Sequence, residues 1–300
     1  MMLSERAATG ETGTLPGPAS DLPGPDWLRG WVERLAVPRH RLAEARANRR
    51  TGALLGASFE RLGLRVVEQG RYANVVALPA GSGPVRLVAA HFDSVPGTPG
   101  ADDNASGVAA MLAVATALSA AGQGRGGTGE RVGFIAFNAE EDGLLGSDDF
   151  VAHGRDELGV DVALVHVLEM VGFRARGRDS QRSPLPRWVP TPREGDFVGL
   201  VGNGASNRAV RDVLRTGEGP RRLGLRTWGP VQRWLPDLGR SDHLPFWRAE
   251  LPAVLWTDTA EFRNPHYHRP GDRPDTLDYT FLHDVAALLL AQLSPTRRRG

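Results

Sequence analysis

The chain has 300 residues, of which 41% are hydrophobic and 24% are charged, a composition typical of a globular domain with a sizeable core. Its net charge is +1, so no basic excess indicates binding to nucleic acid or to an anionic membrane surface. The absence of cysteine excludes disulfides and thiolate metal sites, which leaves His, Asp and Glu as possible metal ligands. All 36 basic residues are arginine, which is most simply explained by a GC-rich genome and favours a bacterial source.

The first 25 residues are polar and rich in Gly and Pro, and we expect them to form a flexible arm. They contain no apolar core of a signal peptide. No run along the chain approaches the roughly 18 consecutive apolar residues of a membrane span. The expected location is therefore cytoplasmic, or secreted if the true start lies upstream, and we expect no membrane partner.

Residues 26–300 are expected to form one domain in which helices and strands alternate. Apolar residues at helical spacing predict helices over residues 26–37, 42–64, 106–122, 143–154, 206–217 and 280–293. Short apolar runs predict strands over residues 65–69, 74–80, 84–94, 131–139, 161–173, 197–202 and 251–260. This alternation predicts an α/β fold, a three-layer α/β/α sandwich around a mixed, largely parallel twisted sheet. Residues 174–196 form an irregular insertion, of the kind that lines or covers a pocket.

Polar side chains follow four of the predicted strands at the point where each strand ends. They lie in residues 91–103, in residues 138–142, at Glu169, and in the stretch that contains His266 and His268. Ligands of open α/β sheets bind at the carboxyl ends of the strands. A solvated surface would scatter its charges between strands and helices alike, so this convergence favours a functional site.

The stretch HFDSVPGTPGADDNASG opens that site. Residues two apart in an extended chain point the same way, so Asp93 can hold the second nitrogen of His91 if the histidine binds a metal. A capped strand end is the alternative for this pair taken alone. Asp102 and Asp103 precede a predicted helix, and a single carboxylate can bridge two metal ions about 3.5–4 Å apart. Helix capping by Asn104 or Ser106 does not explain both aspartates.

Two further acidic positions suit metal chemistry. Glu140 and Glu141 are adjacent, so one can bind metal while the other faces the attacking water as general base. An acidic surface turn is the alternative. Glu169 lies in the predicted strand over residues 161–173, which is apolar enough that an unpaired charge would cost several kcal/mol, so this carboxylate requires a metal or an arginine. Of His266 and His268, one is expected to be a ligand and the other structural.

Together the segments HFDS…GADDNASG, NAEEDGLLGS, LEMVG, SDHLPFW and NPHYHRPGD…DTLDY resemble the two-zinc metallopeptidases. That family includes bacterial aminopeptidases and glutamate carboxypeptidase, with glutaminyl cyclases and the catalytically inactive transferrin receptor as divergent relatives. The five motifs occur in the family's order and spacing, from about residue 30 to the C-terminus.

The resemblance implies two zinc ions per chain and a role for each motif. Carried over by position, the implied metal ligands are His91, Asp102, Glu141, Glu169 and His268. Asp102 is the implied bridging ligand, and Asp103 is expected to be structural. The implied catalytic residues are Glu140 as general base and Tyr267, whose hydroxyl would stabilise the oxyanion. Supporting roles fall to Asp93, Asp242 and Asp272.

The resemblance further implies an exopeptidase that hydrolyses a terminal peptide or aminoacyl amide bond with a metal-activated water, most simply an aminopeptidase. Many members of the family have Asp at the position of Glu169, and the longer side chain puts the choice of peptide terminus in doubt. Alternatives are a carboxypeptidase or other amidohydrolase, a single-zinc glutaminyl-cyclase-like acyltransferase, and a non-catalytic binding homologue. The arginines of residues 174–196 are either substrate ligands or solvated. Oligomeric state is not readable from these residues.

Overall fold

The computed structural model describes residues 1–6, 22–122, 131–183, 185–186, 189–229 and 233–294. Their nine strands form one sheet in the order β1-β8-β7-β9-β6-β4-β5-β3-β2. The strands are β1 (Met2–Arg6), β2 (Arg65–Gln69), β3 (Asn74–Leu78), β4 (Val85–His91), β5 (Arg131–Phe137), β6 (Val162–Glu169), β7 (Val198–Gly202), β8 (Arg222–Arg226) and β9 (Ala253–Thr257).

The sheet is mixed, as predicted. The adjacent strands β5, β4, β6 and β9 run parallel at its centre, and β7 and β8 form another parallel pair. The pairs β1–β8, β2–β3, β3–β5 and β7–β9 are antiparallel. A helical crossover joins β4 to β5 and another joins β7 to β8, and such a connection returns the chain to the same end of the sheet, so both pairs are parallel.

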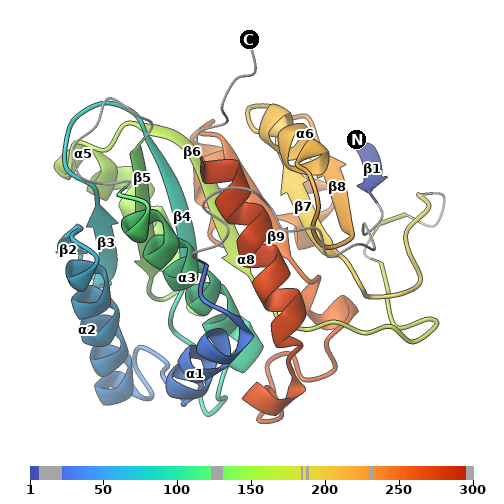
Figure 1. The fold of residues 1–300 in the computed structure, drawn as a ribbon, viewed down its shortest axis with the longest axis horizontal. Coiled ribbons are helices and arrows are strands. Elements are labelled where there is room, and N and C mark those ends of the chain that lie inside the picture. The colour runs from blue at the N-terminus through green and yellow to red at the C-terminus, as the bar shows by residue number, and fades with distance from the viewer. Residues whose placement is uncertain (7–21, 123–130, 184, 187–188, 230–232, 295–300) are drawn as a thin grey trace.

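Helices cover both faces of the sheet, which gives the predicted three layers (Figure 1). One face carries α1 (Pro25–Leu35), α2 (Ala45–Arg61), α3 (Gly107–Ala120), α6 (Asn207–Arg215) and α8 (Tyr279–Leu293). On the other face lie α4 (Leu145–Asp149) and α7 (His243–Arg248), and α5 (Arg155–Glu157) follows α4 after a π-type turn at Phe150–Gly154.

Two apolar cores fill the space between these layers. Helix α3 is apolar on nearly every side, and it is buried between the sheet and α1 and α8. On the other face, Phe137, Phe150 and Phe246 pack against one another with ring centroids 5.9–6.3 Å apart. No helix in the described part of the chain is both long and apolar enough to cross a membrane.

Three elements differ from the sequence-based expectation. Residues 2–6 of the predicted flexible arm form β1, which pairs with β8 at the edge of the sheet. Residues 7–21 of that arm lie outside the described part of the chain. Strand β8 and helix α7 were not predicted. The described residues of the insertion are irregular, as expected. An isolated antiparallel bridge between Ala175 and Gly195 joins its two ends.

Candidate metal centre

The candidate site lies at the carboxyl ends of the central parallel strands (Figure 1). His91 is the last residue of β4, and Glu169 is the last residue of β6. Glu140 and Glu141 follow the end of β5 within a few residues. Because β4, β5 and β6 are adjacent and parallel, their carboxyl ends lie at the same end of the sheet, and these residues therefore lie close together.

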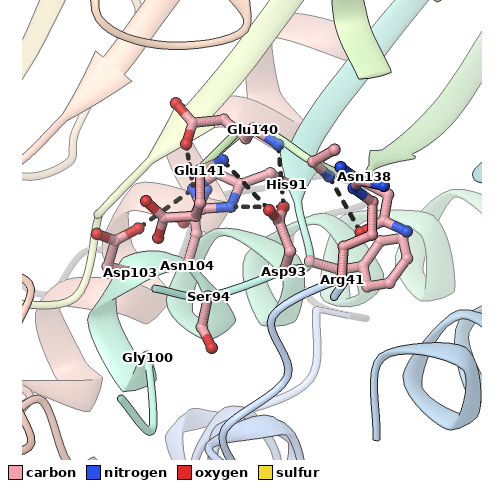
Figure 2. A network of polar contacts seen from close by, with 12 residues as sticks. Arg41, His91, Asp93, Ser94, Gly100, Asp103, Asn104, Asn138, Glu140 and Glu141 are labelled. Carbon is pink, nitrogen blue, oxygen red and sulfur yellow. Dashed lines mark hydrogen bonds and ion pairs between the residues drawn. The ribbon is translucent and has the colours of Figure 1, made fainter. Parts of the chain in front are cut away.

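His91 is fully buried, and Asp93 lies directly behind it (Figure 2). Oδ1 of Asp93 is 3.4 Å from Nδ1 of His91. The Asp93 carboxylate also accepts the backbone N–H groups of Glu140 and Glu141, at 3.3 and 3.2 Å. Asp93 therefore orients the imidazole and holds the loop after β5 at the same time.

Asp103 lies between the two histidines. Its Oδ1 is 3.2 Å from Nε2 of His91, and its Oδ2 is 3.1 Å from Nε2 of His268. Burial alone would raise the pKa of Asp103, but its contacts with His268 and His91 lower it below the ordinary value. Each oxygen of this carboxylate thus faces a different donor group, which is the geometry that a bridging ligand requires.

His91, Asp103, Glu141, Glu169 and His268 form one cluster, and a second carboxylate lies near each of its two histidines. Oε2 of Glu169 is 3.4 Å from Nε2 of His91, and Oε2 of Glu141 is 3.5 Å from Nε2 of His268. Among the described residues, the compact groups of possible ligands are His91–Glu140–Glu169 and His91–Asp103–Glu141. Around Asp103, the ion-pair distances define one half with His91 and Glu169, and another with His268 and Glu141.

These distances fit zinc. Donor atoms about 2.0–2.1 Å from a tetrahedral zinc lie roughly 3.3 Å from one another. The nitrogen-to-oxygen distances within the two halves are 3.1–3.5 Å. Neither ring nitrogen of His91 makes a hydrogen bond within the described residues, although both are buried. A buried imidazole surrounded by carboxylates at this spacing is suited to a metal ion.

The position expected for Asp102 is occupied by Asp103, which corrects the expectation for both residues. Oδ1 of Asp102 accepts the backbone N–H of Gly172 at 3.0 Å, and Oδ2 accepts Nδ2 of Asn264 at 2.7 Å. These bonds turn the Asp102 side chain away from the histidines. The backbone at Asp103 is not helical, with φ −103° and ψ 86°, which directs the Asp103 carboxylate into the cluster instead.

Asp272 binds the backbone of the loop that carries Asp102 and Asp103. Its two carboxylate oxygens accept the backbone N–H groups of Asp102 and Asp103, at 2.8 and 3.0 Å. Burial and the charge of Asp102 raise the pKa of Asp272 to about 7, against the lowering effect of these bonds. Asp272 thus holds the backbone that carries the Asp103 carboxylate.

Glu140 lies beside the cluster with its carboxylate facing His91 (Figure 2). Its Oε2 is 4.0 Å from Nε2 of His91, and its side chain is 9% exposed. Burial raises the pKa of Glu140 well above its ordinary value, against the lowering effect of His91. A buried carboxyl group with a raised pKa, next to a possible metal, has the properties of a general base.

Tyr267 lines the same pocket as Glu140, and its ring stacks on His268 with centroids 3.7 Å apart. Nη2 of Arg240 donates a hydrogen bond of 2.9 Å to the Tyr267 hydroxyl. Since arginine only donates, the phenolic proton remains available to another acceptor.

His266, the alternative histidine, lies against Phe173 with ring centroids 6.3 Å apart. We therefore interpret His266 as structural.

Glu169 has a partner that the sequence analysis did not identify. The Ser241 hydroxyl donates a hydrogen bond of 2.7 Å to Oε2 of Glu169. Its neighbour Asp242 is fully buried, and burial raises the pKa of Asp242 to about 7 against the charge of His91. No hydrogen bond among the described residues joins Asp242 to a ligand, so it acts on the cluster through its charge. The segment SDH that contains both residues was the available signal.

The comparisons with known proteins agree with this geometry. The model of peptidase family M28 matches residues 74–293. YfbL of Escherichia coli, an uncharacterised protein, is 35% identical over 246 residues, which cover 76% of this chain and 74% of YfbL.

Two solved structures add to this. The crystal structure of LapB from Legionella pneumophila matches with a TM-score of 0.70 at 19% identity, over 92% of this chain and 72% of LapB. The structure of BSAP, a zinc aminopeptidase from Bacillus subtilis, matches with a TM-score of 0.50 at 26% identity, over 73% of this chain and 49% of BSAP. The match to the family model spans most of the domain and all the residues of the cluster, and it confirms the resemblance inferred from the sequence motifs: this chain belongs to peptidase family M28.

Proposed function

We propose that this protein is an aminopeptidase that binds two zinc ions and hydrolyses the first amide bond of small peptides or aminoacyl amides. The observation that carries the proposal is the position of Asp103 between His91 and His268, with one carboxylate oxygen toward each. Single-metal sites do not need such an arrangement, whereas a pair of metals about 3.5–4 Å apart does.

The two ligand sets are proposed from these distances. His91, Asp103 and Glu169 would hold one zinc, and Asp103, Glu141 and His268 would hold the other. When bound, zinc lowers the pKa of water to about 7 and polarises the carbonyl group of a substrate. Because the ligand sets share Asp103, its removal would affect both sites.

The residues next to the ligands supply the proton transfers. Glu140 accepts a proton from the attacking water and then donates it to the leaving amine, and its raised pKa suits both steps. The Tyr267 hydroxyl, held by Arg240, donates a hydrogen bond to the carbonyl oxygen as negative charge develops there. Asp93 and Asp272 hold the imidazole and the backbone of Asp103 in place.

Action at the amino terminus is supported by the likeness to BSAP, which is a zinc aminopeptidase. The departure at Glu169 does not weaken this, because Ser241 holds the longer carboxylate within 3.4 Å of His91. The cytoplasmic location expected from the sequence stays a prediction.

The test combines metal analysis with one isosteric variant. We expect two zinc ions per chain by elemental analysis of the zinc-loaded protein. Glu140→Gln should retain both zinc ions and lose about 10²–10⁴-fold in kcat on aminoacyl p-nitroanilides with a free amino group. The exposed Glu60 lies far along the chain on α2, and Glu60→Gln should behave as the wild type. Near-normal turnover in Glu140→Gln would refute its role, and one zinc per chain would refute the two-metal site.

A further inference from the structure

Residues 39–44, between α1 and α2, contact both of the loops that carry Asp103 and the two adjacent glutamates of the site. One is the loop after β4, which ends at Asp103, and Arg39 donates to the carbonyl oxygen of Gly100 within it. The other is the turn after β5, residues 138–144, which carries the proposed general base and a proposed zinc ligand. A single short segment thus connects the two.

Both carboxylate oxygens of Asp142 in this turn are bound by the segment. Nε2 of His40 is 3.1 Å from Oδ1 of Asp142, and Nε of Arg41 donates to Oδ2 at 2.9 Å. Nδ1 of His40 accepts the backbone N–H groups of Leu42 and Ala43, at 3.3 and 3.2 Å. An imidazole whose Nδ1 is an acceptor carries its proton on Nε2. His40 therefore donates that proton to Asp142.

Asp142 directly follows Glu140 and Glu141 in the chain. Consecutive Cα atoms are about 3.8 Å apart, so a displacement of Asp142 moves its two neighbours with it. Within the turn, the N–H groups of Gly143 and Leu144 donate to the carbonyl oxygen of Glu140, at 2.9 and 2.8 Å. These bonds maintain the shape of the turn, but they do not fix its position relative to the histidines of the cluster.

Asp93 and Asp142 fix that position. Asp93 accepts the backbone N–H groups of Glu140 and Glu141 at 3.3 and 3.2 Å, at the long end of the usual range of roughly 2.7–3.2 Å. The contacts of Asp142 with residues 39–44 are shorter, and the one from arginine is charge-assisted and therefore stronger than a bond between neutral groups. The turn is thus held by two sets of bonds, one to its backbone and one to a carboxylate.

The position of this turn matters for both of its glutamates. Oε2 of Glu141 is 3.5 Å from Nε2 of His268, and Oε2 of Glu140 is 4.0 Å from Nε2 of His91. A shift of the turn would displace both carboxylates together. Misplacement of a reacting group by about 1 Å can cost on the order of 100-fold in rate. Loss of a contact that orients a metal ligand typically costs about 10–100-fold in metal affinity.

We propose that His40 and Arg41 are positioning residues that act through Asp142. Their contacts hold the turn that carries Glu140 and Glu141 in place relative to the loop after β4. The roles of the two glutamates rest on the proposed function. The side chains of Arg41 and Asp142 are 25% and 21% exposed, and ion pairs near the surface contribute little to stability. A purely structural role therefore predicts only small effects when these contacts are removed.

The first test measures zinc binding by the metal-free protein, which does not depend on turnover. In Asp142→Ala, competition with a fluorescent chelator should show one zinc site weakened by about 10–100-fold, because Glu141 belongs to only one proposed ligand set. The site that contains Glu169 should change less. The kcat of the zinc-saturated variant should fall by about 100-fold with little change in KM, because Glu140 acts on the attacking water.

The matched control is Asp148→Ala. Asp148 lies on α4, which follows the same turn, and its carboxylate pairs with Arg248 at 3.7 Å. This variant also removes an aspartate from an ion pair, and it should keep the wild-type zinc affinities and kcat. Unchanged affinity at both zinc sites in Asp142→Ala would overturn the proposal.

Two substitutions of His40 separate positioning from a role in the local fold. The side-chain amide of Gln reaches about as far as Nε2 of histidine and can donate to Asp142. That of Asn reaches only as far as Nδ1, where it can accept the N–H groups of Leu42 and Ala43. His40→Asn should therefore show the losses of Asp142→Ala, whereas His40→Gln should retain most of the zinc affinity and kcat. Equal effects of the two substitutions, or the reverse order, would overturn the proposal.

The zinc measurements also separate this proposal from the proposed function. If no amide is hydrolysed but Asp142→Ala and His40→Asn each weaken one zinc site, the positioning role stands and the peptidase function fails. If amides are hydrolysed and neither variant changes zinc affinity or kcat, the function stands and the positioning role fails.

Discussion

Arg39 donates a hydrogen bond of 2.9 Å from Nη2 to the carbonyl oxygen of Gly100, in the loop that carries Asp103, the proposed bridging ligand. The Arg39 side chain is 1% exposed. Its guanidinium also donates to the carbonyl oxygens of Leu35, Val37, Phe92 and Pro99. One buried cation thus joins α1 to both ends of the loop between β4 and Asp103.

Arg39→Met is expected to destabilise the protein by about 3–5 kcal/mol, because it leaves several buried carbonyl groups without donors. Burial lowers the pKa of Arg39, while the charges of Asp272, Asp93 and Asp103 raise it, so the variant also removes positive potential from the cluster. Urea denaturation of the metal-free protein measures the change. The control Arg49→Met, at an exposed site on α2, should stay within about 0.5 kcal/mol of the wild type. A similar small effect at Arg39 would contradict this prediction.

The two adjacent aspartates should respond differently to the same substitution. Each carboxylate oxygen of Asp103 faces one histidine, and Asp103→Asn replaces one of them with an amide NH2 group, which is a poor zinc ligand, so zinc content should fall below two per chain. Asp102→Asn keeps an oxygen for the N–H of Gly172, loses the hydrogen bond from Asn264 and removes like-charge repulsion with Asp258, and since none of these partners is a proposed ligand, the variant should retain both zinc ions. Elemental analysis after dialysis against a weak chelator distinguishes them. Loss of zinc from Asp102→Asn alone would return the bridging role to Asp102.

This pair shows where sequence analysis of the site reaches its limit. Strand periodicity placed His91 and Asp93 on one side of an extended chain, and their 3.4 Å contact agrees with that expectation. Asp102 and Asp103 follow a turn in which Gly100 has a φ of +60°, and neither strand nor helix periodicity applies there. Which of two adjacent carboxylates faces the histidines then depends on distant partners, Gly172 and Asn264, that no local pattern reveals.

In the fold, too, some elements could be predicted from the sequence and others could not. Helix α3 and strands β3 to β6 were predicted because continuous or periodic apolar runs reflect their burial. Strand β8 reads Arg-Leu-Gly-Leu-Arg, only five residues with a glycine at its centre, and β1 has only two apolar residues among its five. Both are strands because each pairs with a neighbour, which is tertiary information.

Shortening Glu169 tests whether its longer side chain is needed for zinc binding. Glu169→Asp withdraws the carboxylate by one methylene, away from the Ser241 hydroxyl and from Nε2 of His91. We expect zinc affinity to fall by more than the roughly 10–100-fold that is typical when a partner of a ligand is lost. Ser241→Ala, which removes only such a partner, should lie within that range. Competition with a fluorescent chelator measures both. Wild-type affinity in Glu169→Asp would show that the longer side chain is not required.

Zinc binding should release protons and strengthen as the pH rises. Burial alone would lower the pKa of His91, but the charges of Glu169 and Glu140 raise it well above its ordinary value. Burial raises the pKa of Glu141 well above its ordinary value, and the charge of Asp103 adds to this. The metal-free cluster therefore holds more protons than free His and Glu side chains would at the same pH, and zinc must displace them, since only deprotonated groups bind the metal.

Because the pKa values of His91 and Glu141 are both raised, the affinity for zinc should increase with pH. A group with a raised pKa opposes zinc binding below that pKa, so affinity should increase from pH 6 to pH 7.5 and decline on acidification. Calorimetry at pH 7 in two buffers of different ionisation enthalpy should record a net release of protons. His283→Gln, at a histidine on α8 that is remote in sequence from every proposed ligand, should release the same number. Zero release in the wild type, together with an affinity independent of pH, would mean that the cluster is already deprotonated without metal.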